Sequence, residues 1–142
     1  MRSVRDDEGN RYLLVKRSAE SSLVRDPATG TERYVPNADL HADAETEPLR
    51  TAAEGIPAPV RRVLTAAPSD RALGLLVELV DRGPVAARTL LDAYDLCESD
   101  LHGLLTEFRA AGLVAETRVA GERGYEATET TREAVRTLRG TE

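Results

Sequence analysis

The sequence predicts an α+β protein in which a small antiparallel β-meander precedes a helix-rich half. Short apolar segments around a turn at residues 26–30 indicate strands in the first forty residues. From residue 69 onward, apolar side chains recur at helical spacing in several successive segments. The length of 142 residues suits one ordinary domain or a small domain with an appendage.

Residues 1–40 are expected to form the meander. Strands are predicted over 11–16, 22–25 and 31–35, and Pro27 and Gly30 supply the backbone conformations that the turn needs. Three short strands bury little apolar surface by themselves, so we expect the meander to pack on the rest of the chain or on a protein partner. The acidic run at residues 6–8 is expected to fray.

Residues 41–57 are acidic at first and are expected to form a linker with a short helix near 49–54. The second domain is predicted over 58–142. Its first helix spans 58–66, has Pro59 in its first turn, and carries an apolar stripe of Val60, Val63 and Leu64.

Three helices are predicted next. The first begins at the N-cap Ser69 and stops at Gly83 and Pro84, and the second spans about 86–94. The third spans 98–111 and packs through Leu101, Leu105 and Phe108. Strands over 113–118 and 124–128 then flank a glycine-containing turn, and a last helix covers about 129–138.

The third helix ends in the sequence AAGLV at residues 110–114, where the chain turns into a strand. With the element order of residues 69–139, this segment resembles the winged helix-turn-helix, and is most similar to ArsR-like and MarR-like repressors. The whole chain also resembles small haloarchaeal proteins with a β-rich N-terminus and a winged-helix C-terminus. The resemblance implies that the third helix enters the DNA major groove. The apolar stripe of Val60, Val63 and Leu64 leads us to expect that the chain dimerises through the helix at 58–66 and the last helix.

The outward face of the third helix supplies most of the candidate DNA contacts. Gly103 and Thr106 stand where ArsR-like proteins often have basic residues, so Arg109 is the only firm positive charge on this face. The wing, residues 115–127, could grip the DNA backbone through its arginines, or these could pair with Glu116 and Glu122. The candidate DNA-binding residues are Arg88, Ser99, Asp100, His102, Gly103, Thr106, Arg109, Arg118 and Arg123.

No metal, cofactor or catalytic site is expected. Metal-sensing ArsR-like proteins carry Cys-x-Cys at the start of the third helix, whereas here Ser99 follows Cys97 by two residues, and we expect Cys97 to be a buried helix-start residue. A single cysteine excludes an intrachain disulfide and a zinc finger. No phosphate loop, nucleophile elbow or metalloprotease motif is present, so the chain is not expected to be an enzyme.

The formal net charge of −6 argues against strong DNA binding in dilute buffer. Lys16 is the only lysine, and the acidic, alanine-rich composition is similar to that of proteins from salt-in halophiles. At molar salt the Debye length falls to about 3 Å. The overall repulsion between an acidic protein and DNA is then mostly screened, and binding depends mainly on local contacts. The alternative interpretation of this composition is an ordinary acidic protein from a GC-rich bacterium. No apolar run is long enough for a membrane helix, and a cytoplasmic location is expected.

The sequence therefore predicts a DNA-binding transcriptional regulator that acts as a homodimer on double-stranded DNA. The alternative is a winged helix that binds protein and not DNA. A positive face on the third helix and wing would favour the first function, and a neutral or acidic face the second.

Overall fold

The computed structural model describes residues 1–140 and shows a mixed α+β protein. The chain divides into two compact units, residues 1–57 and residues 58–142. None of the helices in the described range is both long enough and apolar enough to cross a membrane.

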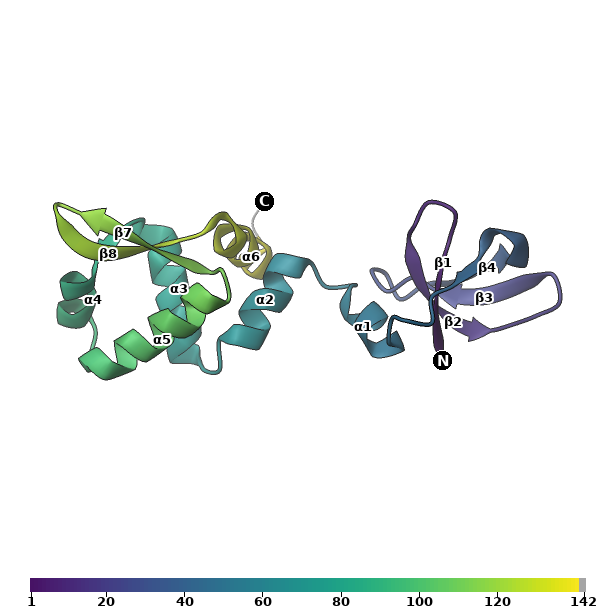
Figure 1. Ribbon diagram of the computed structural model, residues 1–142, viewed down its shortest axis with the longest axis horizontal. Helices are drawn as coiled ribbons and strands as arrows, with labels where there is room; N and C mark the ends of the chain where they lie inside the picture. The colour runs from purple at the N-terminus through teal and green to yellow at the C-terminus, as the bar shows by residue number, and fades with distance from the viewer. Residues whose placement is uncertain (141–142) are drawn as a thin grey trace. The chain divides into compact units, whose positions relative to one another are not determined.

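The first unit is built on a five-stranded antiparallel sheet with the strand order β4-β3-β2-β1-β5 (Figure 1). The bounds are β1 Arg2–Arg5, β2 Arg11–Lys16, β3 Ser21–Arg25, β4 Glu32–Pro36 and β5 His41–Ala42. A 3-10 turn, η1 Asn37–Asp39, joins β4 to β5. The strands predicted near 11–16, 22–25 and 31–35 are confirmed, and β1 and β5 are additional.

The acidic run at residues 6–8 does not fray, because it forms the turn between β1 and β2. Asp6 Oδ1 accepts hydrogen bonds from the backbone N–H groups of Glu8 and Asn10, at 3.0 and 2.9 Å. Its Oδ2 accepts one from the Tyr12 hydroxyl at 3.0 Å. An aspartate that caps its own turn in this way replaces hydrogen bonds that a helix or strand would otherwise supply.

Residues 41–57, expected as a linker, lie within the first unit. β5 pairs with β1, and the helix α1, Pro48–Ala53, contacts β1 and β2. The buried hydroxyls of Ser3 and Thr51 are 2.6 Å apart and share a hydrogen bond. The prediction of a short helix near 49–54 is confirmed. The linker interpretation failed because the polar composition of this segment gives no sign of its long-range contacts.

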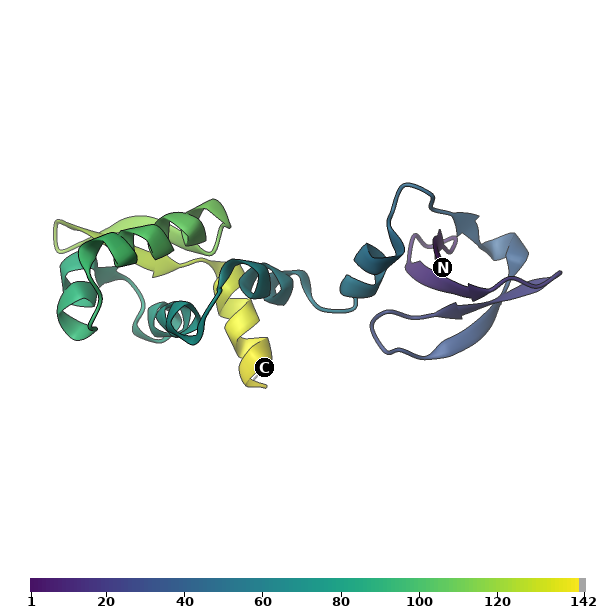
Figure 2. The same cartoon turned by 90° about the horizontal axis from the view of Figure 1, so that it is seen from below.

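The second unit contains α2 to α6 and a three-stranded sheet (Figures 1 and 2). The bounds are α2 Ala58–Ala66, α3 Asp70–Arg82, β6 Val85–Ala86, α4 Ala87–Ala93, α5 Glu98–Ala110, β7 Val114–Val119, β8 Glu122–Ala127 and α6 Glu129–Arg139. The sheet has the order β6-β8-β7, and β6 is the one strand of this unit that the sequence did not predict.

The predicted ends of α3 are confirmed. The Ser69 hydroxyl accepts a hydrogen bond from the Ala72 N–H at 3.2 Å, which satisfies one of the free donors at the helix start. Gly83 follows the last turn with φ of 74°, a conformation that glycine adopts without a steric cost.

A single apolar core holds the second unit together. Phe108, Leu76 and Leu90 are fully buried in it, and α5 contributes Leu101 and Leu105 as well. Val60 and Val63 of α2 are 4% and 1% exposed, and α2 packs against α6 of the same chain. Two of the three residues in the stripe expected at a dimer interface are therefore covered within the chain. Only Leu64, at 61% exposure, remains open.

Candidate functional site

The outward face of α5 is open to solvent. Leu101, Leu105 and Phe108 hold the opposite face in the core, as the sequence predicted. The six predicted contact residues of this helix are all exposed: Ser99, Asp100, His102, Gly103, Thr106 and Arg109. The helix is therefore anchored on one side and available to another macromolecule on the other.

The first turn of α5 is acidic. Glu98 and Asp100 lie in it, and Asp92 and Asp95 shortly precede it; all four are exposed. Residues 92–100 contain no lysine or arginine. Carboxylates near a helix N-terminus are favoured by the helix dipole, but they repel phosphate.

The β7–β8 hairpin ends in a tight two-residue turn. Ala120 has φ of 51° and Gly121 has φ of 82°, and positive values at both central residues are typical of a type I′ turn. Across the hairpin, Arg118 lies directly opposite Arg123. The Arg118 guanidinium donates to the Gly121 carbonyl at 3.2 Å, and among residues 1–140 no carboxylate is in ion-pair contact with it.

Glu116 lies between two arginines that come from different elements. Its Oε2 is 3.2 Å from Arg109 Nη1 on α5, and its Oε1 is 3.0 Å from Arg123 Nε on β8. Arg88 of α4 lies 3.8 Å from Glu122 at the start of β8. Of the two interpretations of the wing arginines, pairing with glutamate holds for Arg123 and not for Arg118.

The pairing of Glu116 with Arg123 could have been derived from the sequence. Side chains alternate along a strand, so Glu116 and Arg118 share a face, and a two-residue turn then places Arg123 opposite Arg118. Arg123 is thereby a diagonal neighbour of Glu116. The contact with Arg109 had no such signal, because it depends on how α5 packs against β7.

Cys97 is exposed, and the expectation that it is buried was wrong. Its Sγ is the N-cap acceptor of α5, 3.4 Å from the Asp100 nitrogen, and it lies 3.3 Å from Ser99 Oγ. The helix begins here, as predicted, but the first turn lies outside the core. No cluster of three or more metal-ligating side chains occurs among residues 1–140.

A groove of about 600 Å³ runs beside the start of α5. Its wall is apolar, with Leu91, Leu101 and Tyr125, and its border carries polar groups. These border residues include Glu98, Ser99, His102 and Arg123. The structure therefore brings residues from the third helix and from the hairpin to one surface.

Arg88, Arg109 and Arg123 each contact a hairpin carboxylate, Glu122 or Glu116. Of these three arginines, only Arg123 lines the groove. The candidate site thus contains four arginines, including Arg118, and a larger number of carboxylates around them. Its charge is mixed: the start of α5 is acidic, whereas Arg118 at the hairpin tip has no carboxylate partner among residues 1–140. The charge criterion by itself therefore does not separate the two predicted functions.

The chain belongs to a family of unknown function, DUF7346, whose model matches residues 1–139. The match covers both structural units, so the two units occur together as a feature of the family. No curated protein and no solved structure matches the chain.

Proposed function

We propose that the second unit is a winged helix-turn-helix domain of the ArsR-like or MarR-like kind and that it binds double-stranded DNA as a transcriptional regulator. The observation that carries the proposal is the exposed outward face of α5 beside an arginine-bearing hairpin. The order α3, β6, α4, α5, β7, β8, α6 supports it, since a recognition helix followed by a β-hairpin is the arrangement of that domain. The proposal involves no catalytic step and no cofactor, and it places the protein in the cytoplasm.

The hairpin and the end of α5 supply the phosphate contacts in this proposal. Arg118 has no acidic partner among residues 1–140, so it can meet a phosphate without first breaking an ion pair. Arg109 and Arg123 share Glu116 and would exchange it for phosphate oxygens. Exposed ion pairs contribute little stability, so the exchange costs little.

Base contacts come from Ser99, His102 and Thr106, whose side chains hydrogen-bond with several bases. The neighbouring Glu98 and Asp100 oppose close approach to phosphate. We therefore expect modest sequence preference and an affinity that depends mainly on backbone contacts.

Dimerisation is part of the proposal. Leu64 on α2 and Leu138 on α6 are 61% and 48% exposed, on two helices that pack together. Sedimentation velocity in molar KCl should show a dimer, and the double variant Leu64→Ser, Leu138→Ser should be a monomer. Leu49→Ser, at a 74% exposed leucine of α1, is the control and should remain a dimer.

Fluorescence anisotropy with a labelled duplex, taken from DNA upstream of the gene, tests the DNA proposal. Arg118→Gln should weaken binding about threefold to tenfold and reduce the salt slope by about one. Arg50→Gln removes an equal charge from α1 and should leave the affinity unchanged. Failure of the wild-type protein to bind any duplex across a KCl series would contradict the proposal.

A protein-binding function is the second candidate, and the acidic segment 92–100 favours it. Four exposed carboxylates around the start of α5 are suited to a basic partner segment. A lysine-rich and arginine-rich peptide should then bind, and Asp95→Asn with Asp100→Asn should weaken it. Arg118→Gln should have no effect on this interaction, which separates the two candidates.

A further inference from the structure

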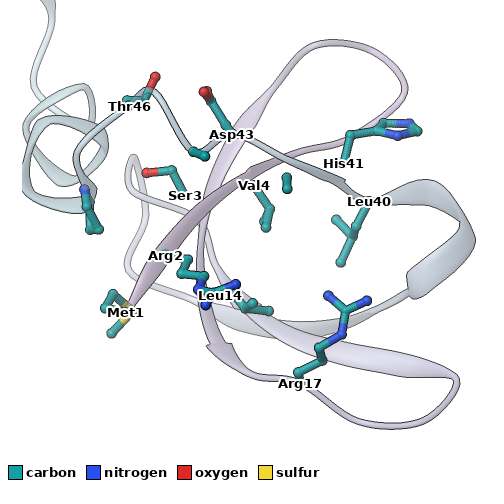
Figure 3. A pocket seen from close by; sticks show the side chains of 13 residues that line it. Met1, Arg2, Ser3, Val4, Leu14, Arg17, Leu40, His41, Asp43 and Thr46 are labelled. Atoms are coloured by element: carbon teal, nitrogen blue, oxygen red, sulfur yellow. The ribbon is translucent and has the colours of Figure 1, made fainter.

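A cavity of about 320 Å³ opens in the first unit, between β1, the end of β2 and the segment from Leu40 to Pro48 (Figure 3). Val4, Leu14 and Leu40 give it an apolar surface. These side chains belong to the core of the first unit, so the cavity is an open end of that core.

Arg2 and Arg17 lie at the border of the cavity, and Figure 3 shows Arg17 directed toward Leu40. Arg2 shares a face of β1 with Val4, since strand residues two apart point the same way, and its partner on β2 is Leu14. Arg17 follows directly after β2. The strand register thus places a cation next to the apolar surface.

In the described part of the chain, the two arginines that line this cavity have no carboxylate partner, unlike several other arginines of the first unit. Within residues 1–140, Arg5, Arg11 and Arg25 each pair with a carboxylate, whereas Arg2 and Arg17 have no such partner. The one carboxylate that lines the cavity, Asp43, is held by Arg5 and Arg11 at 3.1 and 2.8 Å.

His41, the remaining titratable side chain, bonds Asp7 through Nε2 at 2.6 Å. Arg2 and Arg17 therefore place two guanidinium groups, without a carboxylate partner among the described residues, beside an apolar cavity. Such groups can bind an anion from solution.

We propose that this cavity binds a small organic carboxylate with a short apolar body. The carboxylate accepts charge-assisted hydrogen bonds from Arg2 and Arg17, and the apolar body covers Val4, Leu14 and Leu40. The volume lies at the lower end of the range of about 300–1,000 Å³ that ligand pockets occupy, so it suits a body of about six carbons. The first unit then becomes a ligand-sensing part of the protein, independent of what the second unit binds.

Titration of the full chain with hexanoate tests the proposal, followed by amide chemical shifts in ¹H–¹⁵N NMR spectra. Saturable shifts are expected at Val4, Leu14 and Leu40. Arg2→Gln and Arg17→Gln should each weaken hexanoate binding about tenfold, because each removes a charge-assisted hydrogen bond. Both residues are exposed, so the variants should retain the wild-type circular dichroism spectrum.

Lys16→Gln is the matched control, because Lys16 is an exposed cation next to Arg17 that does not line the cavity. It should bind hexanoate as the wild type does. Hexan-1-ol, hexylamine and acetate should bind at least tenfold more weakly than hexanoate.

The proposal is overturned by the absence of saturable shifts up to tens of millimolar hexanoate. Equal binding of hexan-1-ol would overturn it too, since that would exclude a role for the charge. An equal loss of affinity in Lys16→Gln would show a non-specific effect of net charge and would also reject the site.

Discussion

Glu116 neutralises two arginines at the surface where the proposed DNA contact occurs. It links Arg109 of α5 to Arg123 of β8 through its two carboxylate oxygens. A phosphate group would offer the same two arginines a similar set of acceptor oxygens. The side chain therefore competes with DNA for the cations that the proposal needs.

Glu116→Gln is expected to raise duplex affinity about threefold to tenfold and to steepen its salt dependence, since two arginines lose their internal carboxylate. Anisotropy titrations at several KCl concentrations measure both effects. Glu126→Gln removes the same charge from the same hairpin, and among residues 1–140 Glu126 is in no ion pair. An equal gain in both variants would indicate net charge alone, and unchanged affinity in Glu116→Gln would refute the competition.

Asp43 is a buried charged residue of the first unit. Its side chain is 2% exposed, and it accepts hydrogen bonds from Arg11 and Arg5. The Arg11 hydrogen bond is the main cause that lowers the pKa of this carboxyl from 3.8 to about 2. Arg11 also contacts Glu54 at 2.7 Å, so the cluster ties β1 and β2 to residues 43–54.

A pH-dependent stability follows from that shift. The pKa is lower in the folded state than in the unfolded state, where it is near 3.9, so the ionised carboxylate stabilises the fold. This stabilisation is complete above about pH 4 and is lost as the pH falls toward 2. Asp43→Asn should lower the stability of the first unit above pH 4, and its difference from the wild type should shrink toward pH 2.

Urea unfolding followed by NMR signals of first-unit amides measures this difference. Asp39→Asn, at an exposed aspartate of η1, should behave as the wild type. A difference for Asp43→Asn that stays constant from pH 2 to pH 6 would contradict the role assigned to the ion pairs.

At the scale of elements, the β7–β8 hairpin fixes the positions of the wing arginines. Its register runs without interruption from Val114 opposite Ala127 to Val119 opposite Glu122. Gly124 lets β6 approach, because a Cβ there would lie 2.8 Å from the Val85 carbonyl oxygen. The turn itself is not optimal, since Ala120 adopts a left-handed conformation that costs an L-residue with a Cβ about 1 kcal/mol or more.

Ala120→Asn is expected to stabilise the second unit by about 0.5 kcal/mol, because asparagine tolerates this conformation and Asn-Gly is favoured in type I′ turns. Ala120→Val should destabilise it, since a β-branched residue is more strained there. Urea unfolding free energies of the two variants measure the effects. A shift of the same sign in both would contradict the turn geometry.

At the scale of the whole molecule, the chain consists of two units, each with its own apolar core. The proposed DNA contacts all belong to the second unit, and the proposed carboxylate site belongs to the first. Each activity should therefore survive removal of the other unit.

A fragment of residues 58–142 is expected to fold alone and to bind the duplex with an affinity within about twofold of the full chain. NMR spectra of the fragment should overlay on the second-unit signals of the full chain, and anisotropy gives the affinity. A fragment of residues 1–57 should not bind the duplex. An unfolded 58–142 fragment, or a large loss of affinity, would contradict the assignment of DNA binding to the second unit.

The sequence by itself determined the elements that depend on local interactions. Ser69 and Gly83 mark the ends of α3, and the spacing of Leu101, Leu105 and Phe108 gives the buried face of α5. The hairpin after residue 113 follows from its turn residues. Helical period, caps and tight turns are all decided within a few residues, so one sequence is enough to find them.

Only the tertiary structure decided the features that depend on contacts between distant residues. β1, β5 and β6 are short strands that exist because a partner strand lies beside them, and Asp43 is buried because two arginines from β1 and β2 reach it. Tertiary contacts also decided that Val60 and Val63 are covered within the chain and that Cys97 is exposed. They decided the contact of Glu116 with Arg109 as well. Burial and ion pairing are properties of the folded surface, and local sequence carries no direct record of them.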